Sequence, residues 1–111
     1  MKLTYKLRMS EYINEDLQRH SKYMSIHGKK KFIEELNIKF KNIKVMPLMY
    51  ERLYYDKKRN IDYRRLLCKN YIVLYKIYKN QITILRIVSQ KEDYSNSQYF
   101  KSILNQITTF N

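Results

Sequence analysis

Arginine side chains between Asp62 and Tyr94 are the first candidates for chemistry in this sequence. Arg64 and Arg65 form a basic doublet on one expected strand, and Arg86 interrupts a later apolar strand. Arginine binds carboxylates and phosphates through several N–H donors at once. Side chains alternate along a strand, so the two members of the doublet point to opposite faces and at most one of them belongs to any single site.

The chain as a whole is strongly basic. Its 111 residues include 23 Lys and Arg against 10 Asp and Glu, which gives a formal net charge of +13. Such a charge attracts polyanions in general, whether nucleic acid, ribosome, acidic protein or anionic membrane, and it does not choose among them. The two densest runs, Lys29 to Lys31 and Lys57 to Arg59, are typical of solvated surface.

Structural roles compete with binding roles for several of these side chains. Arg86 lies among isoleucines, so we expect it to form a structural ion pair with one of three carboxylates: Asp93, Glu92 or Asp62. The chain also has 12 tyrosines, whose rings can stack on unpaired RNA bases. The tyrosines of the expected strands belong to the sheet, so Tyr94 and Tyr99 are the better stacking candidates.

We expect no metal ion and no cofactor. His20 and His27 are seven residues apart on one expected helix. That spacing is about two turns, or roughly 10 Å, which is too far for one metal ion. Cys68 is the only cysteine, so no internal disulfide forms, and we expect a small structural residue rather than a nucleophile or ligand.

Three consecutive antiparallel strands organise the region that holds the arginines. Tyr71 to Tyr78 is almost entirely β-branched and aromatic, with Lys76 as its only charge, which suits a strand covered on both faces. A Lys-Asn dipeptide forms each connection, at residues 69–70 and 79–80, and asparagine tolerates the left-handed conformation of a two-residue turn. The third strand is expected to place four side chains on one face: Ile82, Ile84, Arg86 and Val88.

The first half of the chain predicts an edge strand and a helical hairpin. Lys2 to Met9 alternates charged and apolar residues, as a half-exposed edge strand does. Ser10 then caps a helix that stops at Gly28, the only glycine. The apolar stripe of that helix consists of Ile13, Leu17, His20, Met24 and His27. A second helix runs from Lys29 to about Lys44, and Pro47 blocks its continuation.

The remaining segments complete an α+β domain. Val45 to Ile61 is interpreted as a structured connection with a short helical turn around Met49 to Leu53. Ser95 or Ser97 caps a final helix that covers the sheet. The order strand, helix, helix, three antiparallel strands, helix predicts one sheet with helices packed on it, in a single domain over residues 1–111. No run is long and apolar enough for a membrane span or signal peptide, so we expect a cytoplasmic protein with no membrane partner.

This element order resembles the RelE/ParE superfamily of bacterial toxins from type II toxin–antitoxin systems. The specific residue pattern runs from Tyr63 to Tyr94 and includes Tyr63-Arg-Arg, Ile84-Leu-Arg-Ile-Val and Asp93-Tyr94. The resemblance implies a cognate antitoxin that wraps an extended or helical segment around the toxin, and the basic chain suits an acidic one. It also implies two different activities. RelE-like members are ribosome-dependent messenger RNA endonucleases, whereas ParE-like members poison DNA gyrase and carry no nuclease site.

The nuclease alternative requires groups that cleave RNA without a metal. A group must take the proton of the 2′-hydroxyl, cations must stabilise the developing phosphate charge, and an acid must protonate the leaving oxygen. In RelE-like sites, cations stabilise the phosphate while tyrosines transfer protons or stack on a base. Carried onto this sequence, the resemblance assigns catalysis to Arg64, Arg65, Lys91 and Tyr94, and RNA binding to Lys69, Arg86 and Tyr99.

Departures from the nuclease pattern favour the gyrase alternative. RelE-like nucleases tend to carry an arginine directly after the tyrosine that opens the middle strand, and here that residue is Ile72. RelE-like nucleases also tend to carry a basic residue or histidine in the exit loop, and here the loop from Ser89 to Asp93 has only Lys91 as a basic residue and no histidine. Many ParE-like chains have a histidine there too, so its absence does not by itself favour the gyrase alternative. The sequence thus predicts a ParE-like gyrase inhibitor with no active site of its own. The alternatives are a RelE-like ribosome-dependent endonuclease and a non-toxic basic nucleic-acid-binding module.

Overall fold

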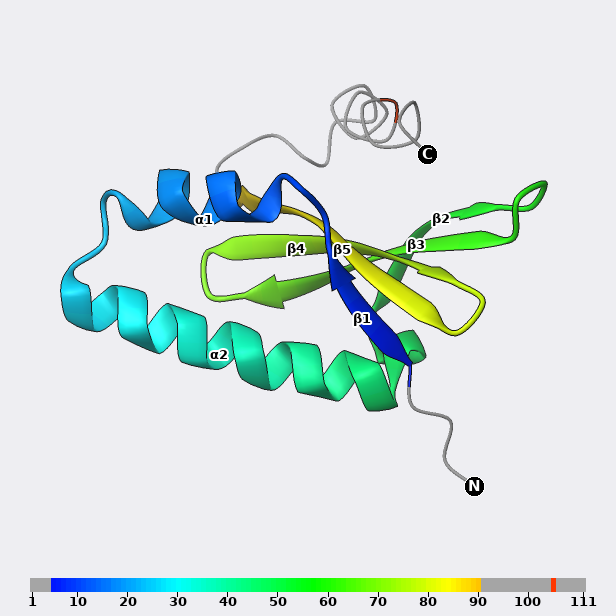
Figure 1. The fold of residues 1–111 in the computed structure, drawn as a ribbon, viewed down its shortest axis with the longest axis horizontal. Coiled ribbons are helices and arrows are strands. Elements are labelled where there is room, and N and C mark those ends of the chain that lie inside the picture. The colour runs from blue at the N-terminus through cyan, green and yellow to red at the C-terminus, as the bar shows by residue number, and fades with distance from the viewer. Residues whose placement is uncertain (1–4, 91–104, 106–111) are drawn as a thin grey trace.

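A computed structural model describes residues 5–90 and residue 105 of the chain (Figure 1). The expected C-terminal helix lies outside the described residues, and so do Lys91, Tyr94 and Tyr99. The elements in the described part are, in order, β1 (Lys6–Met9), α1 (Ile13–Ser21), α2 (Ile26–Val45), the short 3₁₀ helix η1 (Pro47–Met49), β2 (Glu51–Asp56), β3 (Ile61–Cys68), β4 (Tyr71–Tyr78) and β5 (Gln81–Ser89).

The strands form one five-stranded sheet in the order β1-β5-β4-β3-β2. β1 pairs with β5 in parallel, from Lys6 beside Gln81 to Met9 beside Ile84. The other neighbours pair antiparallel. The α+β fold, the edge position of β1 and the three-stranded meander β3-β4-β5 are therefore confirmed.

The two faces of the sheet carry different apolar clusters. Figure 1 shows α1 and α2 joined as a hairpin, with α2 running along the sheet. The helices pack on the face that we call the helix face, where α2 contributes Phe32, Leu36, Phe40 and Ile43 to the main apolar cluster. The opposite face, which we call the second face, carries a smaller apolar cluster made of Ile61, Tyr63, Ile72, Leu74, Leu85 and Val88. β4 thus has buried side chains on both faces, as its composition predicts.

The structure corrects the interpretation of residues 45–61. The helical turn is present, but it spans Pro47–Met49 rather than Met49 to Leu53. The residues after it form β2, a strand that we did not expect. β2 is an edge strand whose only partner is β3, and its register shifts between Arg52 and Tyr54. That irregularity breaks the strict alternation by which a strand is recognised in sequence.

The helix boundaries also differ from the predicted ones. α1 ends at Ser21, so Met24 and His27 do not continue its stripe. Gly28 does not stop a helix: it lies in the first turn of α2, where its N–H donates to the Oγ of the N-cap residue Ser25 at 3.0 Å. A Cβ at Gly28 would lie 3.1 Å from that oxygen, which explains a glycine here without any left-handed backbone.

Two local features of the meander differ as well. Lys69 and Lys79, with φ of 55° and 56°, adopt the left-handed conformation that we expected of the asparagines after them. In the β4–β5 ladder, Leu74 pairs with Arg86 and Tyr75 with Ile84, so Leu85 forms a β-bulge. The bulge shifts the alternation, and Ile82, Ile84 and Ile87 share the helix face while Leu85 and Val88 join the second face.

Candidate functional site

Arg86 forms an ion pair inside the fold, with a partner that we did not predict. Its Nε and Nη2 donate to the two carboxylate oxygens of Asp16 in α1, at 2.9 and 3.0 Å. The same carboxylate accepts the backbone N–H of Ile87 at 2.9 Å, and Asp16 is only 1% exposed. The guanidinium also lies 5.1 Å from the centre of the Tyr12 ring. Arg86 therefore joins α1 to β5.

α1 and the residues before it complete the edge of β5 where β1 stops. The N–H of Ser10 donates to the carbonyl of Ile84 at 2.8 Å, and its hydroxyl donates to the carbonyl of Leu85 at 2.6 Å. Nε2 of His20 lies 2.7 Å from the carbonyl oxygen of Ile87. Ser10 is thus a sheet-edge residue rather than the predicted helix cap, a position that Tyr12 holds.

Arg64 is buried on the helix face and satisfied by the protein itself. Its Nε donates to Asp62 at 3.0 Å, and its Nη1 donates to the backbone carbonyls of Leu48 and Tyr50, at 3.2 and 2.5 Å. The arginine therefore ties the segment around η1 to the sheet. A ligand would have to displace three protein acceptors to use this side chain.

Arg65 and Lys69 are the remaining residues of the nuclease alternative that the structure describes. Arg65 is on the opposite side of β3 from Arg64, as alternation requires, and its Nε donates to Glu51 of β2 at 2.6 Å. Lys69 is exposed in the β3–β4 turn, and its carbonyl accepts from the side chain of Gln90 at 3.0 Å. Arg64 therefore lies on the helix face, whereas Arg65 and Arg86 are both register partners of Leu74, on its two sides. Each of these two arginines is held by a carboxylate, Glu51 for Arg65 and Asp16 for Arg86.

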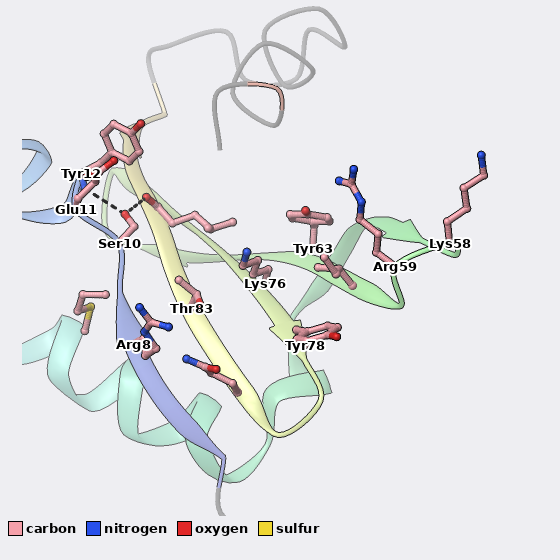
Figure 2. Close-up of a pocket in the computed structure, with 14 residues that line it drawn as sticks. Arg8, Ser10, Glu11, Tyr12, Lys58, Arg59, Tyr63, Lys76, Tyr78 and Thr83 are labelled. Atoms are coloured by element: carbon pink, nitrogen blue, oxygen red, sulfur yellow. Dashed lines mark hydrogen bonds between the residues drawn. The ribbon is translucent and has the colours of Figure 1, made fainter. Parts of the chain in front are cut away.

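A different group of side chains lies together on the second face. In the strand register Arg8 pairs with Thr83, Thr83 with Lys76, and Lys76 with Tyr63, so these four form a row across β1, β5, β4 and β3. Figure 2 shows this row continuing to Arg59 in the β2–β3 turn. The row crosses an open trough of about 940 Å³, which we call the cationic trough. Its other lining residues include Lys58, Tyr78, Gln81, Tyr12 and Glu11.

The cationic trough is electrostatically unbalanced. Among residues 5–90, no carboxylate forms an ion pair with Arg8, Lys58 or Lys76, and Arg59 has only Asp56 at 4.0 Å. Burial, together with the charge of Arg8, lowers the pKa of Lys76 from its usual 10.5. Burial raises the pKa of Tyr63, whose hydroxyl is enclosed and has no hydrogen-bond partner in the described part of the chain. Buried polar atoms rarely lack a partner. Arg8, Lys58, Arg59 and Lys76 outnumber Glu11, the one carboxylate among the lining residues, and such an excess of positive charge favours an anion.

Sequence reasoning missed the cationic trough although two signals pointed to it. Lys76 is the only charge in an otherwise apolar central strand, and Arg8 lies on the polar side of the alternating β1. The sequence does not show the register that pairs both residues with Thr83. β1 and β5 are neighbours in the sheet but far apart in the sequence, so no local pattern reveals their pairing.

The described residues contain no group of three or more His, Cys, Asp and Glu side chains that could hold a metal ion. Cys68 is buried at the end of β3, and burial with the nearby carboxylate of Glu35 raises the pKa of its thiol to about 11. A thiol with such a pKa is a poor nucleophile at neutral pH. None of the helices in this part of the chain is long and apolar enough to cross a membrane.

Two solved structures share this fold at low sequence identity. The archaeal RelE–RelB complex from Pyrococcus horikoshii OT3 contains a chain 17% identical to this one, with a TM-score of 0.54, over 80% of this chain and 98% of that one. The chromosomal ParDE system from P. aeruginosa contains one that is 15% identical, with a TM-score of 0.58, over 78% of this chain and 96% of that one. None of the curated proteins searched matches the sequence.

The family assignment rests on the sequence itself. Residues 7–94 match the family described as the ParE toxin of the type II toxin–antitoxin system parDE. The matched range begins within β1 and runs beyond the end of β5, and so takes in all of the sheet except Lys6. The chain belongs to the ParE toxin family of type II toxin–antitoxin systems.

Proposed function

We propose that this toxin inhibits DNA gyrase by protein–protein contact, with no active site of its own, and that it acts in the cytoplasm. The observation that carries the proposal is the environment of Ile72. This residue is fully buried in the apolar cluster of the second face, beside Leu74, Leu85 and Val88. RelE-like nucleases tend to carry an arginine at that position, and a cleavage site needs its cation within reach of a phosphate.

The pairing of the other candidate cations supports the same proposal. Arg64 is held by Asp62 and two carbonyls, Arg65 by Glu51, and Arg86 by Asp16. An RNA phosphate would have to compete with a carboxylate already in place at each of the three arginines. Groups that stabilise a transition state are most effective when they are already oriented toward the reacting atoms, and these guanidinium groups are oriented toward the fold.

We further propose that a cognate acidic antitoxin neutralises the chain. The two structural relatives are described as a RelE–RelB complex and a ParDE system, so each toxin was found with its antitoxin. The formal net charge of +13 gives this chain a long-range attraction for an acidic segment. Association of the two should therefore slow as salt is added.

A supercoiling assay with purified DNA gyrase tests the proposal. The folded chain at micromolar concentration should block supercoiling and should cause gyrase-linked DNA breaks to accumulate. Unchanged supercoiling and no added breaks would remove gyrase as the target. Primer extension on a defined message in a translation extract then decides the nuclease alternative. New ribosome-dependent 3′ ends would return the catalytic assignment to Arg64, Arg65, Lys91 and Tyr94.

A further inference from the structure

We propose that the cationic trough binds the phosphodiester backbone of a single-stranded nucleic acid. The described residues that the nuclease alternative uses, Arg64, Arg65, Lys69 and Arg86, do not line this trough. The proposal does not depend on gyrase being the target. Its centre is the row formed by Arg8, Thr83, Lys76 and Tyr63.

Two cations of the row face each other across one neutral residue. Arg8 and Lys76 are both register partners of Thr83, on its two sides. Adjacent strands lie about 4.8 Å apart, so the backbones of the two residues are about 10 Å apart, with Thr83 between them. Lys76 is half-buried beside the second cation, which disfavours its charge, and an anion above Thr83 would relieve that repulsion.

The trough extends beyond this pair, as a polymer would require. Lys58 and Arg59 stand at its far end in the β2–β3 turn (Figure 2). Lys79 adds a charge beside Tyr78, with Nζ 5.4 Å from the ring centre. Cations therefore occur along the full width of the sheet, which suits a chain of phosphates better than one isolated anion.

Tyrosine rings accompany the cations. Tyr78 is 41% exposed at the edge of the trough, and the half-exposed Tyr54 packs on Tyr63 with ring centres 6.0 Å apart. A basic groove with aromatic rings beside it is the arrangement by which proteins hold single strands, because every unpaired base offers a flat face for stacking. A duplex hides those faces.

An acidic peptide fits the same trough less well. An extended peptide gains affinity by pairing with the edge of a sheet, whereas the row of the trough lies on the face of the sheet, across β1, β5, β4 and β3. A helical peptide needs an apolar groove, and the row across this trough consists of Arg8, Thr83, Lys76 and Tyr63.

Fluorescence anisotropy of a labelled single-stranded oligonucleotide tests the proposal. The logarithm of the binding constant of the wild-type chain should fall linearly with the logarithm of the salt concentration. The slope should be about 0.7 for each phosphate that the chain contacts. The double variant Arg8→Gln with Lys76→Gln should lose affinity about tenfold and reduce the slope by about 1.4. The matched control, Lys30→Gln with Lys31→Gln, removes the same charge from exposed positions on α2 and should leave the slope nearly unchanged.

Further variants and competitors distinguish a specific site from binding by net charge. If the double variant does not fold by circular dichroism, the exposed Arg8→Gln change alone should lower the slope by about 0.7. Tyr78→Leu should weaken the binding of single-stranded DNA and of single-stranded RNA, but not the binding of a duplex. Equal weakening by the trough variant and the α2 control would overturn the proposal, because binding would then follow net charge alone. If polyglutamate competes as strongly as the unlabelled oligonucleotide, the proposal is overturned in favour of an acidic peptide.

Discussion

Replacing Asp16 with alanine should destabilise the fold more than any surface charge change. The carboxylate is 1% exposed and accepts three hydrogen bonds from β5, two from Arg86 and one from the N–H of Ile87. The variant Asp16→Ala removes all of these acceptors at once. It leaves a guanidinium that is 16% exposed without its carboxylate, and the buried N–H of Ile87 without its acceptor.

The magnitude follows from those losses. Removing one partner of a buried ion pair costs about 3–5 kcal/mol. The Arg86 side chain can recover some hydration at its exposed part, so we expect the lower end, about 3 kcal/mol, out of a typical total of about 5–15 kcal/mol. With an m-value of about 1–3 kcal/mol/M, the urea midpoint should fall by about 1–3 M while the m-value stays constant.

Arg19 provides the matched control. It also pairs with Asp16, at 3.3 Å, but its side chain is 48% exposed. Arg19→Ala should therefore cost less than about 1 kcal/mol. A double-mutant cycle between Asp16→Ala and Arg86→Ala should give a coupling of about 1–3 kcal/mol, since the two groups are in direct contact. An Asp16→Ala variant no less stable than Arg19→Ala would refute the view that α1 is held to β5 through this carboxylate.

Three further predictions concern buried groups. Ile72→Arg should lower the free energy of unfolding by at least about 3 kcal/mol, because it places an unpaired charge in the apolar cluster of the second face; an unchanged melting temperature would contradict that burial. Burial raises the pKa of Tyr63 and Tyr75 above 10.0, so the folded chain keeps protons that the unfolded chain releases. Stability should be complete below that value and fall as the pH rises above it, and melting temperatures that stay constant up to about pH 11 would speak against it. Cys68, with its pKa of about 11, should react with a disulfide reagent at neutral pH at least about tenfold more slowly in the folded chain than in urea, and equal rates would show an accessible thiolate.

Local pattern was sufficient for most of the sheet and for both helices. β4 and β5 could be predicted because branched and aromatic residues fill most of each strand, with Lys76 and Arg86 as their only charges. α2 could be predicted because its apolar residues recur at helical spacing. β2 could not, since only Leu53 and Asp56 of its six residues are half-buried and the rest are exposed. An edge strand packed so little carries almost no alternation to read.

Long-range pairings were beyond the reach of local pattern. Arg86 was expected to be structural, but its partner Asp16 is 70 residues away and joins it only because β1 runs parallel to β5 and leads directly into α1. The bulge at Leu85 also has no distinctive residue to mark it, although it decides which side chains of β5 face the helices. For the same reason, the cationic trough can be recognised only when the register of its four strands is known.

The most direct test of the proposed function applies one preparation of the folded chain to two assays in parallel. The account predicts that purified gyrase loses supercoiling activity and accumulates linked DNA breaks, while primer extension in a translation extract shows no new 3′ ends. New ribosome-dependent ends together with unaffected gyrase would contradict it, and would show that the chain cleaves message despite the buried Ile72.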